Sequence, residues 1–144
     1  FLRPLKGFVQ NLTPAGTQGT ALVTYSTLSV VVPRTGDYKL EWSFLWSLNT
    51  TGSDFLFRVL QDGATTLYEQ RDEPQDSGGT GITITNLDGG TFNTGTDQKH
   101  VGSGFIILEN LSAGSHDLEF QLANSLADTE AAIYQLSATI EEWI

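Results

Sequence analysis

The chain has 144 residues, of which 39% are hydrophobic, and this is enough apolar material for one compact domain with its own core. Seven Lys and Arg stand against 17 Asp and Glu, a formal net charge of −10. This balance excludes a nucleic-acid partner held through its phosphates and argues against docking on an anionic membrane. Cysteine is absent, which excludes disulfides, thiol catalysis and Cys-based zinc sites. No apolar run approaches the roughly 20 residues of a membrane span.

The first 19 residues are apolar but repeatedly broken by proline and glycine, as at Pro4, Gly7 and Pro14. This pattern predicts an extended N-terminal arm over residues 1–19, followed by one folded domain over residues 20–144. An arm of this kind cannot bury its apolar side chains alone, so it needs a groove on its own domain or on a neighbour. The side chains expected at such an interface are Phe1, Leu2, Leu5, Phe8 and Val9. Methionine is absent and Phe1 is large, so we expect a processed or truncated product.

From residue 20 onward, apolar and polar residues alternate, which is typical of half-buried strands. The longest case covers residues 38–48, where an aromatic-rich set falls on one face. The other candidates, in chain order, are residues 22–25, 28–32, 55–60, 66–70, 81–86, 104–108, 117–122 and 134–141. A helical turn has a place only within residues 126–132. About nine strands with turn-rich connections predict an all-β antiparallel sandwich.

The connections carry turn residues that fit this architecture. Asp62-Gly63 is typical of a type I′ hairpin turn, because both positions can adopt positive φ. Ser112–Ser115 predicts another tight turn. Asp76–Gln98 is rich in Gly, Thr, Asn and Asp and predicts a long excursion, a kind of loop that is usually functional or interface-forming.

The sequence offers few candidates for catalysis. Ser115-His116-Asp117 contains the residue types of a hydrolase triad, but alternation places His116 on the opposite face from its neighbours, so these three cannot form the triad's hydrogen bonds. The carboxylate pairs Asp72-Glu73 and Glu141-Glu142 likewise face opposite ways in an extended chain. We therefore expect no catalytic residues, no cofactor and no enzyme activity.

The sequence also contains few candidates for a metal site or an aromatic binding site. His100 and His116 lack metal-ligand spacing, so no metal ligands are assigned. Aspartates near glycines could hold a structural calcium ion, but no Asp-x-Asp-x-Asp-Gly run is present; they are Asp62, Asp76, Asp88 and Asp97. Trp42 and Trp46 fall on the apolar face of the long strand and are expected in the core, whereas Trp143 either closes the sandwich or contacts a neighbour.

Two stretches carry a resemblance to a known fold. Residues 32–44 (VPRTGDYKLEWSF) and residues 111–121 (LSAGSHDLEFQ) resemble recurring segments of jelly-roll proteins of the tumour necrosis factor and complement-globular type. The same order, over residues 20–144, is similar to trimeric decoration (cement), fibre and tail proteins of tailed bacteriophages. The resemblance implies an antiparallel jelly-roll sandwich that assembles as a homotrimer with capsid or other virion subunits, on the exterior of a capsid or tail.

Our leading hypothesis is therefore a non-enzymatic virion protein, a decoration or cement subunit that binds and stabilises a phage capsid. The alternative is a carbohydrate-binding or receptor-binding jelly-roll module of a tail fibre or a secreted protein, which would expose aromatic side chains on one face or in the loop over residues 76–98.

Overall fold

The computed structural model describes residues 5–48, 53–72, 83–85, 91–93, 100–127 and 130–143. For residues 83–85 and 91–93 it describes the strands only. The strands are β1 (Leu5–Asn11), β2 (Ala15–Gln18), β3 (Val23–Val32), β4 (Gly36–Leu48), β5 (Phe55–Gln61), β6 (Thr65–Asp72), β7 (Thr83–Thr85), β8 (Thr91–Asn93), β9 (His100–Leu111), β10 (Gly114–Asn124) and β11 (Glu130–Glu142). Within these ranges no helix of membrane-spanning length and hydropathy occurs.

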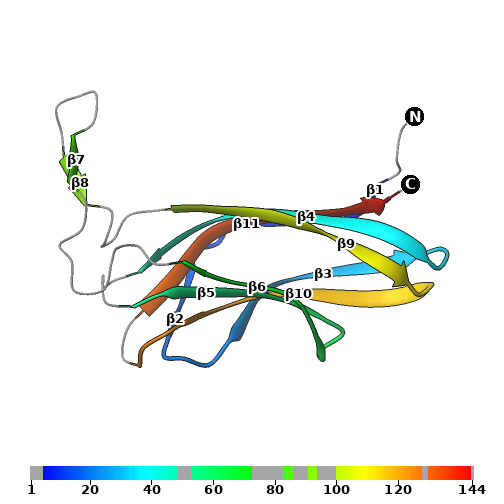
Figure 1. Ribbon diagram of the computed structural model, residues 1–144, viewed down its shortest axis with the longest axis horizontal. Coiled ribbons are helices and arrows are strands. Elements are labelled where there is room, and N and C mark those ends of the chain that lie inside the picture. Colours follow the sequence, from blue (N-terminus) through cyan, green and yellow to red (C-terminus); the bar gives the residue numbers. More distant parts are fainter. Residues whose placement is uncertain are drawn as a thin grey trace.

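The strands form two packed layers (Figure 1). Sheet A has the order β1-β11-β4-β9, with β2 also paired to β11, and sheet B has the order β3-β10-β5-β6. All pairings are antiparallel. From β2 onward, consecutive strands lie in opposite sheets, except for β5 and β6, which form a hairpin within sheet B. The connection from β6 to β9 also crosses between the sheets, and it carries the β7–β8 pair. The expected all-β, tumour-necrosis-factor-like jelly roll is confirmed.

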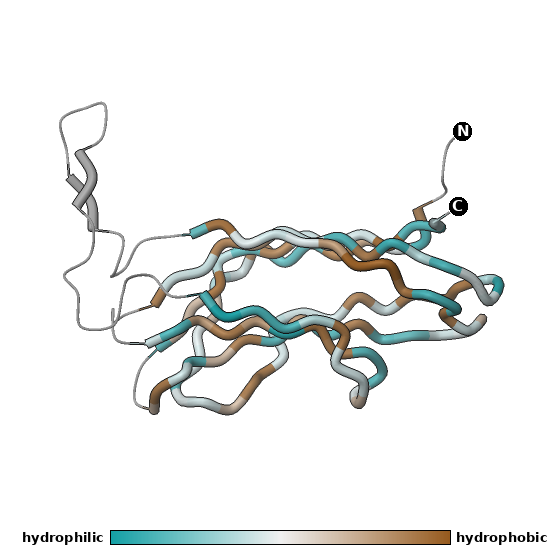
Figure 2. Tube along the Cα trace, in the orientation of Figure 1, coloured by the Kyte–Doolittle hydropathy of each residue, from teal (hydrophilic) through white to brown (hydrophobic). Residues whose placement is uncertain are grey.

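The core lies between the sheets and is built from alternate residues, as the colouring along each strand shows (Figure 2). The inner row of β4 is the most aromatic part of it. Phe44 stacks on Phe57 with ring centroids 4.3 Å apart, and Trp46 stacks on Phe55 at 4.7 Å. The row's buried members are Tyr38, Leu40, Trp42, Phe44, Trp46 and Leu48, so the expected core position of Trp42 and Trp46 is confirmed.

Strand β9 is longer than the expected residues 104–108, and two glycines on its inner side, Gly102 beyond that range and Gly104 at its start, are part of it. Gly102 pairs with Phe44 and Gly104 pairs with Trp42 across the sheet. Both rings lean under β9: a Cβ at Gly102 would overlap the Phe44 ring, and one at Gly104 would lie 2.8 Å from Cζ2 of Trp42. The glycines therefore leave space for the rings and do not end the strand.

Two other expectations change in detail. Residues 22–25 and 28–32, expected as separate strands, are one strand, β3, with a bulge opposite Phe120 and Gln121. The place left for a helical turn at residues 126–132 holds the start of β11 from Glu130. The Asp62-Gly63 turn is confirmed, with φ of 52° and 72°.

The N-terminal segment, expected as an arm over residues 1–19, lies on the domain's own sheet in its described part. β1 and β2 both pair with β11, so residues 5–18 extend sheet A and do not stand apart from residues 20–144. Side chains hold the segment in place: the Tyr25 hydroxyl donates to the Thr13 carbonyl at 2.7 Å, and Asn124 Nδ2 donates to the Thr17 carbonyl at 3.0 Å.

We predict that Gly102→Ala lowers the free energy of unfolding by about 1–3 kcal/mol or more, because the added methyl group must displace the Phe44 ring from a packed core. Urea unfolding measures this loss. Gly36→Ala is the matched control, because nothing lies within 4 Å of its added Cβ, and its effect should stay within about 0.5 kcal/mol. Equal effects of the two substitutions would contradict the packing described here.

Candidate functional site

The structure brings Ser, His and Asp together, but not the three consecutive residues of the sequence. His116 points inward and is 7% exposed, and its partner is Asp62 of the β5–β6 turn. Its Nδ1 lies 2.8 Å from Asp62 Oδ2, and its Nε2 lies 2.7 Å from the Ser112 carbonyl oxygen. This contact is not evident from the sequence, because Asp62 is 54 residues from His116 and its place in a turn explains the aspartate without a partner.

Both ring nitrogens of His116 face acceptors, so both must carry protons. The ring is then an imidazolium that joins the β5–β6 and β9–β10 turns. The backbone N–H of Asp117 also donates to Asp62 Oδ1 at 2.8 Å. We call the group Asp62, Ser112 and His116 the turn latch.

The turn latch is not arranged as a hydrolase triad. The Ser112 hydroxyl is 3.4 Å from His116 Nε2, but the Nε2 proton is directed to the closer Ser112 carbonyl. A general base needs a free lone pair at that nitrogen to accept the serine proton. The latch therefore crosslinks turns and offers no base to a nucleophile.

The electrostatics of the latch favour the ion pair. Burial alone lowers the pKa of His116, but the hydrogen bonds to Asp62 and Ser112 and the charge of Asp62 outweigh it, so the net pKa lies above 6.5. Burial likewise raises the pKa of Asp62, and the hydrogen bonds from Asp117, His116 and Gln61 outweigh this effect, so the net pKa lies below 3.8.

Metal sites find no support in the described part of the chain, where no group of three or more potential ligands gathers. Asp62, one of the aspartates considered for calcium, is engaged in the turn latch. Asp76, Asp88 and Asp97 lie outside the described residues. The Glu141-Glu142 pair separates as expected: Glu142 is buried, 3.1 Å from Arg34 Nη2, whereas Glu141 faces outward on β11.

The five residues expected at an interface divide into three groups. Leu5 and Phe8 are 56% and 53% exposed on the outer face of sheet A. Val9 points inward and packs against the core. Phe1 and Leu2 lie outside the described residues.

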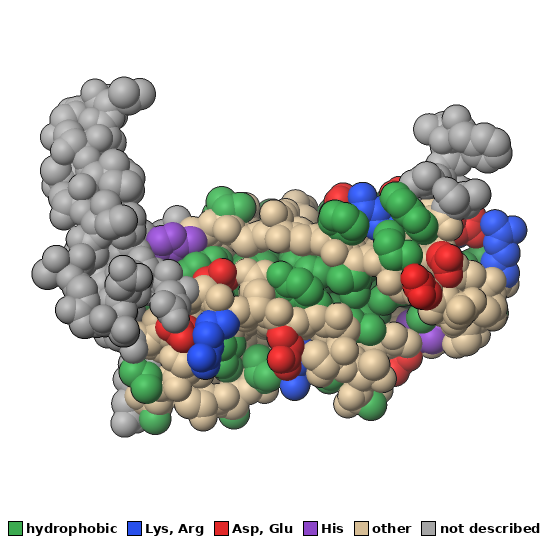
Figure 3. Space-filling view, viewed as in Figure 1, with side chains coloured by type: hydrophobic (Ala, Val, Ile, Leu, Met, Phe, Trp, Pro, Cys, Tyr) green, Lys and Arg blue, Asp and Glu red, His purple; other side chains and the backbone are tan. Residues whose placement is uncertain are grey.

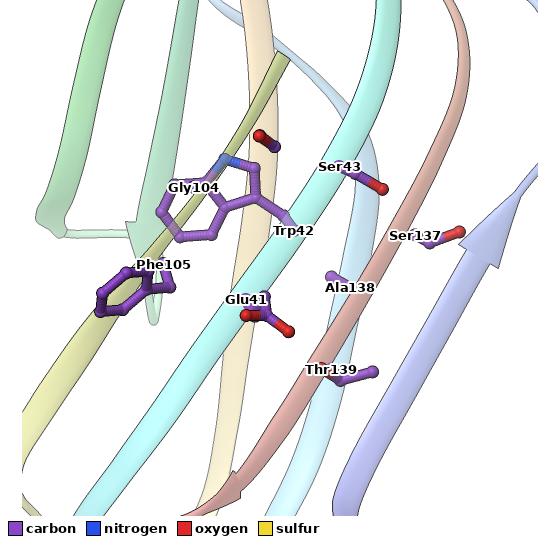
Figure 4. A pocket seen from close by; sticks show the side chains of 9 residues that line it. Glu41, Trp42, Ser43, Gly104, Phe105, Ser137, Ala138 and Thr139 are labelled. Atoms are coloured by element: carbon purple, nitrogen blue, oxygen red, sulfur yellow. The ribbon is translucent and has the colours of Figure 1, made fainter. Parts of the chain in front are cut away.

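The outer face of sheet A carries a shallow groove that runs across the strands (Figure 4). One wall is a ridge formed by residues in register on four strands: Phe105, Glu41, Thr139 and Phe8. The other side is a trough of smaller polar residues, also in register: Ser103, Ser43, Ser137 and Gln10. The row between them, which includes Gly104, Trp42 and Ala138, turns its side chains inward and forms the floor.

Phe105 and Trp143 were not expected on this face. Phe105 is 59% exposed and Trp143 is 39% exposed, and Lys39 Nζ lies 4.9 Å and 5.6 Å from the two ring centroids. Lys39 also pairs with Glu41 at 3.2 Å. Phe105 is out of phase with the inward-facing Ile106 and Leu108, but the apolar Ile107 shares its phase, so the sequence alone does not show which set faces outward.

The two outer faces carry similar numbers of charged side chains and differ in where these lie. On sheet B the outward positions include five ionisable side chains: Arg58, Glu69, Arg71, Asp117 and Glu119. On sheet A five charged outward residues lie at one end, namely Asp37, Lys39, Glu41, Glu109 and Glu141, and Glu130 lies at the other end. Figure 3 shows charged side chains on both layers and apolar ones between the layers on the edge formed by β9 and β6. Exposed aromatic rings such as those of Phe8 and Phe105 are typical of interfaces.

No protein-family model matches the chain, and no curated protein matches its sequence. Solved structures of the same fold include one of infectious bursal disease virus, Gx strain, with a TM-score of 0.59 and 6% identity over 98% of this chain and 32% of the viral one. Another is the Eiger TNF of S. frugiperda, with a TM-score of 0.56 and 10% identity over 99% and 93% of the two chains. The VP2 subviral particle of the same virus has a TM-score of 0.53 and 7% identity, over 95% and 32%. The chain spans about a third of the viral proteins, and identities this low establish the fold alone.

We predict that the turn latch stabilises the fold most between about pH 4 and 6.5. The His116 contribution is complete below 6.5 and is lost as the pH rises through the raised pKa; the Asp62 contribution is present above 3.8 and is lost as the pH falls through the lowered pKa. His116→Gln should cost about 1–3 kcal/mol near pH 5 and less above pH 8, measured by urea unfolding. Asp62→Asn should remove most of this pH dependence. A loss that is the same at pH 5 and pH 8.5 would show that the ring is neutral in the fold.

Proposed function

We propose that the chain is a non-enzymatic structural subunit of a virus particle, a decoration (cement) protein that binds the outside of a capsid and stabilises it. The observation that supports the proposal is the outer face of sheet A, with the exposed aromatic rings of Phe8, Phe105 and Trp143. The fold is shared with proteins of a viral particle, which supports this role. The resemblance of residues 32–44 and 111–121 adds the finer expectation of a tailed bacteriophage and three copies at each site.

The N-terminal segment is the part proposed to contact the capsid. Its described part starts at the exposed Leu5 in β1, at the same end of the molecule as the end of β11 (Figure 1). Sheet B would face the solvent, and the net charge of −10 on the whole chain would keep particles apart.

The groove on the outer face of sheet A favours carbohydrate or receptor binding as a second candidate function. The groove on sheet A is lined by a row of hydroxyl groups, one carboxylate and the exposed ring of Phe105. Sugars bind to such combinations of a stacking surface and hydrogen-bonding groups. A glycan array separates the candidates: binding that is abolished by Phe105→Ser would favour this module, and an array without hits would remove it.

The capsid role predicts that particles lacking this chain disassemble at a lower temperature and regain their stability when it is added back. The test variant lacks residues 1–4, which leaves β1 whole, and also carries Leu5→Ser. Its co-sedimentation with the particles should fall by at least tenfold, because the proposed contact loses its apolar side chains.

Val31→Ser is the control for that experiment, because Val31 is 70% exposed on sheet B. It should bind particles like the parent chain. Equal binding by the N-terminal variant, or no gain in particle stability from the parent chain, would contradict the proposal.

A further inference from the structure

We infer that the free edge of β9 binds an extended segment of a partner protein, which pairs with β9 as an added antiparallel strand of sheet A. β9 ends the strand order of this sheet, and among the described strands it pairs with β4 alone. In an antiparallel ladder, alternate residues of such a strand turn their N–H and C=O groups away from the sheet. An extended peptide that pairs with these groups gains affinity from main-chain hydrogen bonds and specificity from its alternate side chains.

The sequence of β9 leaves this edge unprotected. Residues 101–108 contain no charged residue and no proline. Their register with β4 is unbroken, so no bulge turns the edge aside. Lys, Pro, a bulge or a covering element is what usually keeps an exposed edge from pairing with another chain.

The other described edges carry such protection. β6 has three charged residues and a shift in its register with β5. β1 has seven residues and a bulge, and β2 has four residues. β3 is contacted from the other layer by β1, and Asn11 Nδ2 donates to the Tyr25 carbonyl of β3 at 3.3 Å. Of the edges that the structure describes, β9 is therefore the one suited to an added strand.

β9 also carries apolar side chains on both of its faces. Ile106 and Leu108 face the gap between the layers, whereas Val101, Phe105 and Ile107 point to the outer face of sheet A. Val101 and Phe105 are 74% and 59% exposed. An added strand would place its own side chains directly beside these residues, and apolar cross-strand pairs of this kind stabilise a sheet.

The gap between the layers is open along the same edge. On the opposite side of the sandwich β1 contacts β3, whereas a hollow lies between β9 and β6. Its apolar lining includes Leu67, Ile106 and Leu108, and Figure 3 shows apolar side chains between the layers along this edge. The inward-facing side chains of an added strand would enter the hollow, which selects a segment with apolar residues at alternate positions.

Charge indicates which end of the bound segment is basic. Glu109 is exposed just beyond the uncharged run, and no Lys or Arg of the described chain forms an ion pair with it. Asp37 lies at the same end, where its carboxylate accepts the backbone N–H of Asn110. A strand antiparallel to β9 begins at this end, so its first residues would be Lys or Arg. The net charge of −10 also favours a basic partner over a second copy of this chain.

This site does not depend on the proposed capsid role. The N-terminal segment tested above lies at the opposite edge of sheet A, on β1 and β2. Loss of binding at one edge therefore leaves the other edge intact, and the two proposals fail separately.

Hydrogen exchange of the whole chain, followed by NMR with the synthetic peptide RKTVTITVT, tests the site. The peptide begins with basic residues and then alternates threonine with β-branched apolar residues. In the free chain, alternate amides of residues 101–108 should exchange rapidly, and saturating peptide should slow them at least tenfold. The peptide RKTVTPTVT should bind at least tenfold more weakly, because its central proline has no N–H to donate.

A charge exchange tests the direction of the bound strand. Glu109→Lys should weaken binding of RKTVTITVT about fivefold and strengthen binding of EETVTITVT, because the basic end of the peptide meets this position. Glu119→Lys makes the same change of net charge on β10, in the other sheet, and is the matched control. It should have little effect on either peptide. Circular dichroism checks that each variant is folded.

Several results would overturn the inference. One is the absence of binding at about 1 mM peptide. Others are β9 amides that are already protected in the dilute free chain, and protection that rises with the concentration of the chain alone, because either would show that the chain itself covers this edge. Protection confined to β6, or equal effects of Glu109→Lys and Glu119→Lys, would place the peptide elsewhere.

Discussion

The packing of the aromatic row of β4 against β5 is the constraint on which the rest of the structure depends. Phe44 and Trp46 stack on Phe57 and Phe55 with centroids under 5 Å apart, and these contacts fix the two sheets face to face. Because strand side chains alternate, committing these residues to the core assigns their neighbours to the outside. The rings also fill the space under β9, so that strand carries glycine on its inner side and a separate set of residues on its outer side.

This division leaves the outer face of sheet A free to take a composition suited to a partner. Its ridge and trough depend on register and side-chain size, and they do not contribute to the core. The proposed binding role therefore uses the face that folding leaves unused, and the turn latch joins the β5–β6 and β9–β10 turns independently of it.

The fold could be predicted from the sequence because alternation is a local property. The strand over residues 38–48 and the Asp62-Gly63 turn needed only neighbouring residues to be identified. Strand β9 was underestimated because Gly102 has poor strand propensity in isolation, and the Phe44 ring that requires it comes from another strand. The contact between His116 and Asp62 could not be predicted, since it depends on which two turns meet. Phe105 was overlooked for a related reason: a strand with apolar residues on both faces does not reveal which face is inward.

Hydroxyl-radical footprinting of the chain with and without capsid particles tests the central claim most directly, because it measures which side chains become covered. The account predicts that oxidation of Phe8 and Phe105 falls when particles are added, while that of Tyr25, outside the outer face of sheet A, does not change. Constant oxidation of Phe8 and Phe105 on particles that carry the chain would show that the outer face of sheet A faces solvent, and would contradict the account.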